Sequence, residues 1–490
     1  PRWLQTAYTT SHIQSALTTL DEREDARIKA KSKAASEAIS SHLHSSDSAF
    51  DSSESINFYS IASGTLPVNR QRNRYMDVLP YDRTRVKIKV PHFGNPGRLY
   101  LNANWVQEKY GRKWWIASQA PLRNTAYTFL SLLLEDMFPP SLSPSVASTS
   151  SNPSVLALKS RINESHHSRP RTVVQLTQNV ESGRRKAHPY FPDVVGQTMI
   201  IVPDITDYPS SSPTSTSASQ LASSKLKVTL VAQEEIREAC CVKSTVEVRP
   251  FLDAVVDDED NHYGDSYDSS TTSSVHRKPK STRSKTYPAI RFTHLLFVAW
   301  PDHSVPSPSD RAALFEFVRL VDRVNRQMPF DDSGSGSSQT THIRPEKDVD
   351  LDPPIIVGCS AGIGRTGSFI AMNSLLRHAG FLPPPGDLQH PSSSSPLPSP
   401  HPPPSTQLSQ TTSFPTSSSS STAPTSTTTP PLDASTTSYN SHTPVVGPLG
   451  PLPTSLSADL VSQEIDSLRE QRAGMVQRPE QAVLVYEMMV

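Results

Sequence analysis

The sequence predicts an α/β (α+β) protein: one domain built on a highly twisted mixed β-sheet, flanked by helices and interrupted by long disordered inserts. Short segments rich in β-branched residues alternate with segments of helical periodicity, but without the strict strand–helix–strand rhythm of a parallel sheet. Between them lie tracts of Ser, Thr and Pro: 45 of the 490 residues are proline, and only 35% are hydrophobic. Such tracts cannot bury enough apolar surface to offset the entropy lost on ordering, so roughly 280–320 residues remain for one folded domain.

Helices are expected where apolar residues recur at helical spacing. Ile13, Leu17 and Leu20 share one face of the first helix, as Leu314 and Phe317 do in a later one. Prolines stop the second helix, and Gly380 suits the C-terminus of the fourth. The expected helices are 10–44, Thr125–Met137, Ser309–Gln327, a segment from the glycine-rich turn to His378, Ser457–Gln471 and Glu480–Met489.

Strands are expected where β-branched residues alternate or cluster over a few positions. The last of them, Pro354–Val357, is entirely apolar and therefore reads as a buried strand. It runs directly into the glycine-rich turn. The expected strands are Arg85–Val90, Lys113–Ser118, Arg171–Thr177, Thr198–Pro203, Lys225–Ala232, Val242–Val248, Ile290–Ala299 and Pro354–Val357.

The inserts fall between these elements, as tolerated surface loops do. The domain is expected to span 10–490, with low-complexity inserts at about 141–168, 208–224, 253–285, 331–350 and 381–455. Ser-Pro and Thr-Pro pairs in them, such as Ser395-Pro396, are candidate sites for proline-directed kinases, and the tracts could bind adaptor proteins. In serine-rich tracts such pairs also arise by coincidence.

Charge and cysteine usage exclude several classes of protein. Lys plus Arg and Asp plus Glu are both 47, so no global basic field recommends nucleic acid or an anionic membrane. No apolar run approaches the roughly 20 residues of a membrane span. The cysteines Cys240, Cys241 and Cys359 make no disulfide framework or metal-binding spacing, which suits a reducing compartment, and no metal or cofactor is expected. We expect a cytoplasmic location, with the nucleus as a second site; the sequence also reads as a fragment of a longer chain.

The segment Ile355–Gly367 (IIVGCSAGIGRTG) carries the strongest chemical signal. A buried strand, a glycine-dense turn and a helix follow one another, which directs several backbone N–H groups and the positive end of a helix dipole into one small cup. The cup fits a tetrahedral dianion. Inside it, Cys359 would be an ionised nucleophile, and Arg365 would bind two phosphoryl oxygens in a bidentate pair.

Two other interpretations of this segment carry little weight. Gly362, Gly364 and Gly367 match the spacing G-x-G-x-x-G of a dinucleotide-binding turn. That fold also needs an acidic residue at the end of a second strand about 20 residues later. Asp387 has the spacing but lies in a proline-rich segment that cannot be a strand. A purely structural glycine turn with an idle cysteine is the other alternative.

The combination Cys-Ser-Ala-Gly-x-Gly-Arg-Thr-Gly at Cys359–Gly367 resembles the signature of the protein tyrosine phosphatases, here taken to be of the non-receptor type. The resemblance implies that the amides of the loop bind the phosphoryl oxygens and that Thr366 stabilises the departing thiolate. The loop residues so assigned are Ser360, Ala361, Gly362, Ile363, Gly364 and Arg365.

Further motifs resemble other parts of that family. Trp300-Pro301-Asp302 is similar to its mobile loop, in which Asp302 would be the general acid for the leaving phenolate. The segment RNRYMD resembles its tyrosine-recognition loop, in which Tyr75 would stack on the substrate ring and Asp77 would accept hydrogen bonds from its backbone.

Two other segments, one near the C-terminus and one at 180–192, carry the remaining matches. Gln477 would position the hydrolytic water, with Gln481 nearby; Glu181 would pair with Arg365, and Lys186 would lie near Asp302. The alternative for each of these motifs is an ordinary structural role: a proline turn, a packed tyrosine, a helix-end glutamine, a solvated ion pair, or a helix cap for Thr366.

The sequence departs from the family pattern at the residue before the nucleophile. Gly358 stands where most members have histidine, and Ala120 stands where glycine is usual. Because glycine supplies no side chain and loosens the backbone, we expect the Cys359 thiol to ionise less readily and turnover to be reduced but not abolished. On this view Gly358→His should raise turnover.

The resemblance implies hydrolysis of phosphotyrosine in proteins through a cysteinyl-phosphate intermediate, in signal transduction. The partners would be phosphotyrosyl proteins. Two alternatives stay open at this point: a catalytically weak or inactive phosphotyrosine-binding pseudophosphatase, suggested by Gly358, and an interaction scaffold that works through the Pro/Ser tracts.

Overall fold

The computed structural model describes residues 2–43, 58–88, 99–140, 168–204, 224–252, 285–302, 304–327, 350–386 and 447–490. The expected inserts lie largely outside these residues. Both ends of the last one, 381–386 and 447–455, are described and pack on the domain: Leu382 is buried, and Arg326 donates a hydrogen bond to the carbonyl of Pro384. No helix in the described part of the chain is long and apolar enough to cross a membrane.

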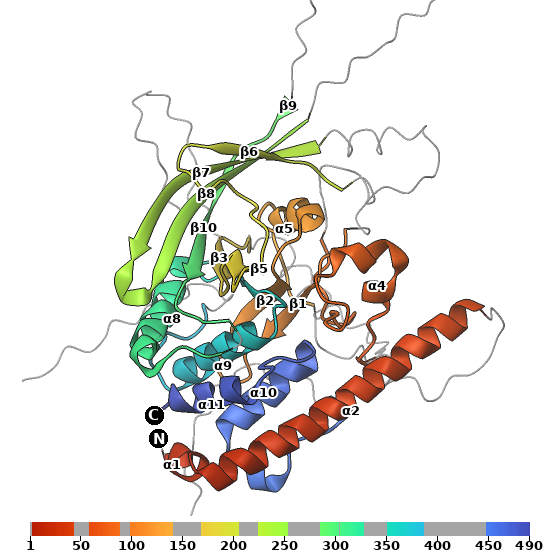
Figure 1. The fold of residues 1–490 in the computed structure, drawn as a ribbon, viewed down its shortest axis with the longest axis vertical. Helices are drawn as coiled ribbons and strands as arrows, with labels where there is room; N and C mark the ends of the chain where they lie inside the picture. The colour runs from red at the N-terminus through yellow and green to blue at the C-terminus, as the bar shows by residue number, and fades with distance from the viewer. Residues whose placement is uncertain are drawn as a thin grey trace, which may run out of the picture. The chain divides into compact units, whose positions relative to one another are not determined.

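A mixed sheet forms the centre of the protein (Figure 1). Its strands follow the order β1-β2-β11-β3-β10-β8-β7-β6, and β9 pairs with β8. The pairings β2–β11, β11–β3 and β3–β10 are parallel, whereas the remaining pairs are antiparallel. The strands are β1 (Ala103–Gln107), β2 (Trp114–Gln119), β3 (Thr172–Gln175), β6 (Thr198–Ile201), β7 (Ser224–Ile236), β8 (Cys241–Leu252), β9 (Lys285–Thr286), β10 (Ile290–Phe297) and β11 (Ile355–Cys359). A separate hairpin joins β4 (Val180–Glu181) to β5 (Arg184–Arg185).

Strand β11 lies in the parallel centre of the sheet, between β2 and β3. Its apolar residues are fully buried because both of its faces are covered. Ligand sites of such sheets lie beyond the carboxyl ends of the parallel strands. The segment that follows Cys359 leaves the sheet at that edge.

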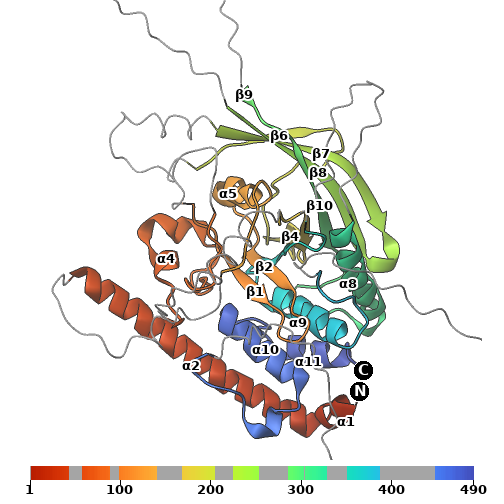
Figure 2. The ribbon, with the colours of Figure 1, turned by 180° about the vertical axis from the view of Figure 1, so that it is seen from behind.

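Helices cover both faces of the sheet (Figures 1 and 2). One core cluster joins α8, α9, α10 and α11 to one face, and a second joins α5 to the other. The α-helices are α1 (Arg2–Ala7), α2 (Thr10–Leu43), α4 (Ala62–Thr65), α5 (Ala126–Ser131), α8 (Arg311–Arg326), α9 (Gly364–His378), α10 (Leu460–Gln471) and α11 (Pro479–Glu487). Short 3₁₀ turns are η1 (Pro67–Arg72), η2 (Arg123–Thr125), η4 (Arg237–Ala239), η5 (Pro308–Asp310) and η6 (Thr454–Leu456).

The long helix α2 runs beside α10 and α11 (Figure 2). Its Arg27 is fully buried and donates hydrogen bonds to Asp466 and Glu470 of α10. Glu470 also accepts a hydrogen bond from the Tyr59 hydroxyl at 2.7 Å. A buried charge is tolerated only when it is paired, so these contacts fix α2 on the domain.

Two expected elements differ in the structure. The segment 85–88 forms no strand: it contacts β1 only through the bridge from Arg85 to Asn104 and neighbouring backbone bonds, and 89–90 lie outside the described residues. The helix expected over Thr125–Met137 ends at Ser131, because the next amides bond to the carbonyl three residues back. The other expected helices and strands are present within a few residues of their predicted ends, and Gly380 has the positive φ (+82°) of a C-terminal cap.

Buried Glu464 on α10 gives the stability of the fold a pH dependence. Burial raises its pKa to about 8, although hydrogen bonds from Ser374 and the amide of Lys109 lower it in part. Between about pH 4.5 and 8 the folded state therefore holds a proton that the unfolded chain has lost, so stability falls as pH rises, by at most about 1.4 kcal/mol per pH unit.

We expect Glu464→Gln to remove this dependence. The melting temperature of the variant, minus that of the parent, should rise steadily from about pH 5 to 8 and level off above. Differential scanning fluorimetry across that range measures it, with Glu234→Gln, at an exposed position on β7, as the control. A difference that stays constant with pH would show that Glu464 is ionised throughout.

Candidate active site

The loop between β11 and α9 forms a cup of backbone amides. Gly362 has a φ of +72°, and a Cβ atom there would lie 2.2 Å from the carbonyl oxygen of Ser118, so only glycine fits. The carbonyl oxygens of the loop accept hydrogen bonds from neighbouring segments. The guanidinium of Arg472 donates to the carbonyls of Ala361 and Gly362, and the amide of Ala120 donates to the carbonyl of Ser360. No acceptor among the described residues binds the N–H groups of 360–363, which leaves these donors for an anion.

Cys359 and Arg365 lie at opposite ends of this loop. Cys359 ends β11 and is buried, and Arg365 lies in the first turn of α9. Arg365 is held by a bidentate pair with Glu181, at 2.7 and 2.9 Å, and by a hydrogen bond to the carbonyl of Leu176. Burial alone would lower the pKa of Arg365, but the hydrogen bond with Glu181 and the charge of Cys359 raise it overall. The guanidinium is therefore a fixed positive charge beside the sulfur.

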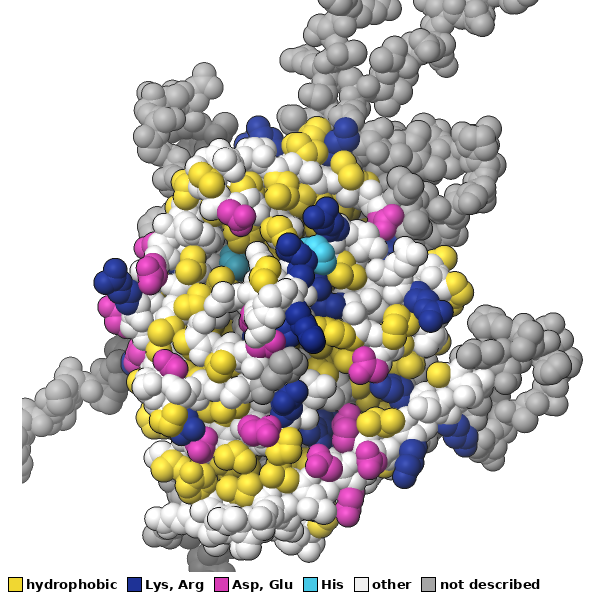
Figure 3. All heavy atoms as spheres, viewed as in Figure 1, with side chains coloured by type: hydrophobic (Ala, Val, Ile, Leu, Met, Phe, Trp, Pro, Cys, Tyr) yellow, Lys and Arg dark blue, Asp and Glu magenta, His cyan; other side chains and the backbone are white. Residues whose placement is uncertain are grey.

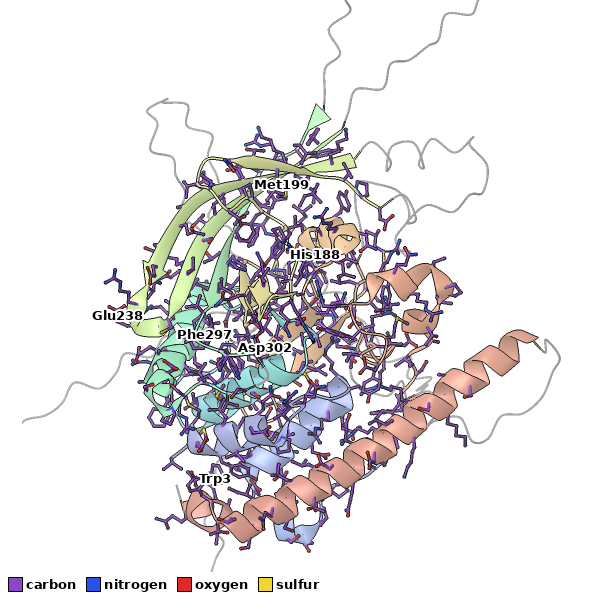
Figure 4. All side chains as sticks on the ribbon, viewed as in Figure 1. Trp3, His188, Met199, Glu238, Phe297 and Asp302 are labelled. Atoms are coloured by element: carbon purple, nitrogen blue, oxygen red, sulfur yellow. The ribbon has the colours of Figure 1, made fainter. Side chains whose placement is uncertain are left out.

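Asp302 reaches the same guanidinium from the segment after β10. Its carboxylate lies 3.4 Å from Nη2 of Arg365 and accepts a hydrogen bond from Lys186 Nζ at 2.9 Å. Trp300 anchors the segment: its ring is buried, and its Nε1–H donates to the carbonyl of Ser304. Figure 4 labels Asp302 close to the β4–β5 hairpin, whose following residue is Lys186.

Tyr75 forms one wall of the site. Its hydroxyl lies 2.9 Å from Oγ of Ser360, and the residue is 38% exposed, so it can contact a bound molecule. The side chain of Asp77 is exposed, and the backbone carbonyl of Asp77 accepts a hydrogen bond from Nζ of Lys31 in α2. The structure thus brings the segment 74–77 to the rim of the phosphate loop.

The two glutamines differ in their positions. Gln481 is buried, and a Cβ atom on Gly364 would lie 2.9 Å from its carboxamide, so it packs on the start of α9. Gln477 is exposed and follows Val476, whose amide donates to the carbonyl of Ile363. Gln477 is thus on a loop tied to the phosphate loop, with its side chain directed to solvent.

The positions of Thr366 and Gly358 differ from what the resemblance implies. The hydroxyl of Thr366 is fully buried and has no hydrogen-bond partner in the described part of the protein, Cys359 included. A Cβ atom on Gly358 would lie 2.7 Å from the carbonyl oxygen of Ser118 in the adjoining strand. A histidine at 358 would therefore require the backbone of β11 or β2 to shift, and the sequence-based expectation that it raises turnover stays a prediction.

Sequence reasoning missed the arginines that hold these loops. Arg472 is 1% exposed, binds two loop carbonyls and also donates to the amide oxygens of Asn102 and Asn104. Arg469 binds the carbonyls of Met475 and Val476. In the sequence both are ordinary charged residues near a helix end, and nothing in their spacing separates them from solvated ones.

Comparisons with known proteins find similarity to protein tyrosine phosphatases. The family model "Protein-tyrosine phosphatase" matches residues 69–138 and 256–380. The chain is 25% identical to receptor-type tyrosine-protein phosphatase eta of Gallus gallus over 309 residues, 63% of this chain and 14% of that protein. It is 28% identical to human receptor-type tyrosine-protein phosphatase H over 309 residues (63% and 18%).

Two further similarities complete the comparison. Tyrosine-protein phosphatase non-receptor type 9 of Mus musculus is 26% identical over 310 residues, 63% of this chain and 35% of that protein. The crystal structure of a Trypanosoma cruzi protein tyrosine phosphatase aligns with a TM-score of 0.41 at 17% identity, over 86% of this chain and 82% of that one. The chain spans between 14% and 35% of the length of these three curated relatives.

Proposed function

We propose that the chain is a protein-tyrosine phosphatase, which hydrolyses phosphotyrosine in proteins through a cysteinyl-phosphate intermediate; the match of its residues 69–138 and 256–380 to the family model supports this. The observation that supports this most is the placement of Cys359 and Arg365 at the two ends of a loop with unbound amides. The non-receptor type expected from the sequence stays a prediction, since receptor-type and non-receptor-type phosphatases both match.

In the first step, the Cys359 sulfur attacks phosphorus while the phenolate leaves. Arg365 and the amides of 360–363 bind the phosphoryl oxygens, whose charge is spread in the transition state. Asp302 gives a proton to the leaving oxygen. Because Arg365 Nη2 binds both Asp302 and the carbonyl of Pro301 here, the segment 300–302 must adjust when phosphate takes over that nitrogen.

In the second step, water attacks the phosphorus of the cysteinyl-phosphate, and the thiolate leaves. Asp302, now a carboxylate, takes the proton from that water, and Gln477 positions it. Gln477 can do so only if its exposed side chain turns toward the loop, which its place next to Val476 allows.

Selectivity for phosphotyrosine follows from the depth of the cup. The ring of Tyr75 raises one wall above the phosphate loop, through its contact with Ser360. A phenyl phosphate can span that depth, whereas the short side chain of phosphoserine brings the peptide backbone against the wall.

The test is phosphate release from a phosphotyrosyl peptide and from the same peptide with phosphoserine. We expect release from the first alone, and a covalent phosphoenzyme on Cys359 when the reaction is quenched in acid. Release from both peptides at similar rates, or phosphate on another residue, would contradict the proposed mechanism.

A pseudophosphatase that binds phosphotyrosine without hydrolysing it is the second candidate, and Gly358 is the observation that favours it. It would bind the phosphotyrosyl peptide as tightly as an enzyme does but release no phosphate. Equilibrium binding and phosphate release, measured on the same preparation, separate the two.

We expect Gly358→His to lower turnover by at least about tenfold, because any side chain there pushes β2 away from β11 and distorts the loop. The melting temperature should fall as well. Gly380→Ala is the control: it too strains the backbone, at a φ of +82°, but a Cβ there meets nothing within 4 Å, so kcat should be unchanged. Turnover that rises in Gly358→His would restore the sequence-based expectation.

A further inference from the structure

The connection between α10 and α11, residues 473–478, holds a strained backbone; we call it the glutamine loop. Val476 has a φ of +55°, a left-handed conformation that is unfavourable for a β-branched residue. A residue stays in such a conformation only where the surrounding structure holds it there. Gln477 comes directly after Val476, so the contacts that hold this loop also decide where the Gln477 side chain starts.

The second half of the glutamine loop is held by α9 and α10. Arg469 of α10 donates hydrogen bonds to the carbonyls of Met475 and Val476, both at 2.9 Å. The amide of Val476 donates to the carbonyl of Ile363, and a Cβ atom on Gly367 would lie only 2.3 Å from that amide nitrogen. These contacts fix the peptide groups that follow Gly474.

The start of the loop is held by Glu24, which comes from the N-terminal helix α2. Its Oε1 accepts a hydrogen bond from the amide of Gly474 at 3.0 Å. Its Oε2 lies 3.3 Å from Nη1 of Arg27 and 3.9 Å from Nε of Arg469. The Glu24 side chain is 15% exposed, so this carboxylate is largely shielded from water. One side chain of α2 thus connects the loop to an arginine of α2 and to an arginine of α10.

The helix α2 is itself fixed on the domain, so Glu24 has a defined position. Besides Arg27, Arg23 binds both oxygens of Asp466 on α10, at 2.9 and 3.0 Å. In the other direction, Nη1 of Arg469 donates to the carbonyl of Leu20 at 2.8 Å. Figure 3 shows acidic and basic side chains next to one another along the path that α2 follows in Figure 1. A helix held at several points can support a loop.

The same face of α2 reaches a second part of the site. Lys31 lies two helical turns after Glu24 and therefore on the same side of the helix. Its Nζ donates a hydrogen bond to the backbone carbonyl of Asp77 at 3.1 Å, in the segment that carries Tyr75. The face of α2 that carries Glu24 and Lys31 therefore contacts both the glutamine loop and the segment 74–77.

We propose that Glu24 is a positioning residue for the second step of the reaction: by holding the amide of Gly474, it keeps the glutamine loop in the conformation from which Gln477 places the attacking water. This inference rests on the proposed function and adds to it a role for α2. In this step water attacks phosphorus, the S–P bond breaks, the water proton passes to Asp302 and inorganic phosphate leaves. The first step uses no water, so Glu24 acts on the second step alone.

The test is a single turnover of a radiolabelled phosphotyrosyl peptide by Glu24→Ala and by the parent, with enzyme in excess and rapid quenching in acid. Formation of the cysteinyl-phosphate measures the first step, and its decay measures the second. We expect the decay to slow by at least about fivefold and the formation to stay within about twofold, because a small displacement of the water is costly only in the second step. Where the second step limits turnover, kcat and KM should fall together and kcat/KM should stay unchanged.

The matched control is Arg23→Ala, at the neighbouring position of α2. It removes the contact with Asp466 but none with the glutamine loop, so it should lose stability and keep the rates of both steps. A second variant, Glu24→Gln, keeps the size of the side chain. Its one carboxamide oxygen can accept from Gly474 or face Arg27, but not both, so the decay should slow less than in Glu24→Ala. This variant carries the same comparison if Glu24→Ala does not fold.

Amide hydrogen exchange, measured by mass spectrometry, separates this inference from the proposed function. Deuterium uptake over 474–477 should rise in Glu24→Ala and stay as in the parent in Arg23→Ala, whether or not the protein hydrolyses the peptide. A parent that forms no cysteinyl-phosphate would defeat the proposed function, and the uptake would still show whether Glu24 holds the loop. Unchanged uptake or unchanged decay in Glu24→Ala, equal slowing of both steps, or equal slowing in Arg23→Ala would overturn the inference.

Discussion

Cys359→Ser should lower phosphate release from a phosphotyrosyl peptide by at least about 10⁴-fold and leave binding of the peptide within about threefold. Serine has nearly the volume of cysteine, so the loop can keep its shape. Its hydroxyl does not ionise near neutral pH, and no general base is available to activate it, since in the proposed first step Asp302 is the protonated general acid. Initial rates and anisotropy on the same preparation measure the two effects.

Cys240→Ser is the control for this substitution. Cys240 is a free, half-buried thiol in the connection from η4 to β8. The Cys240→Ser variant should keep full turnover, and iodoacetate should still inactivate it by alkylating Cys359. If Cys359→Ser retained more than about a tenth of the turnover, the sulfur could not be the nucleophile and the loop would serve binding alone.

The sequence predicted those parts of the site that lie within one short segment. The residues from Ile355 to Gly367 hold a strand, a turn and a helix start in consecutive order, so local rules suffice to place Cys359 against the amides. Pairings between motifs, such as Glu181 with Arg365, came from the resemblance, and the structure shows the contact. Periodicity likewise predicted α8, which buries one apolar face, and α2, although α2 packs through charged Arg27 as well as Leu20 and leaves Ile28 exposed.

Errors arose where a buried face was mistaken for sheet pairing. Val86 and Ile88 alternate like strand residues, and both are buried. The backbone hydrogen bonds to β1 are few, however: the amide of Val86 donates to the carbonyl of Ala103, and the carbonyl of Thr84 accepts from the amide of Trp105. Alternation reports which side chains are covered; it does not report where the backbone hydrogen bonds go. The helix α5 is shorter than expected for a similar reason. The apolar run continues beyond Ser131, but the backbone there changes from helical hydrogen bonds to turns with bonds three residues back.

Contacts between distant residues were beyond the reach of sequence reasoning. Arg472 and Gly362 are 110 residues apart, and Arg74 and His188 are 114 apart. Each of these arginines is indistinguishable in sequence from a solvated one. Only the folded backbone shows that Arg472 is covered completely and that its guanidinium has four acceptors around it.

Arg472→Met should be the most destabilising single substitution near the site. It leaves the carbonyls of Ala361 and Gly362 and two asparagine oxygens without their donor, at a cost of about 3–5 kcal/mol. Burial lowers the pKa of Arg472 to about 10, so the guanidinium is still charged at neutral pH and the loss includes a charge-assisted contact. We expect a melting temperature lower by roughly 6–20 °C.

The same substitution should also reduce kcat in the protein that remains folded. Without Arg472 the two loop carbonyls are free to turn, and the amides of the cup lose their common direction. Arg171→Met is the matched control, because Arg171 is also buried and binds two backbone carbonyls, those of Asn325 and Leu351, but contacts neither loop of the site. It should lose stability and keep kcat per folded molecule. If Arg472→Met did the same, the arginine would support the fold alone, and the amides of 360–363 would hold their orientation through the geometry of β11 and α9.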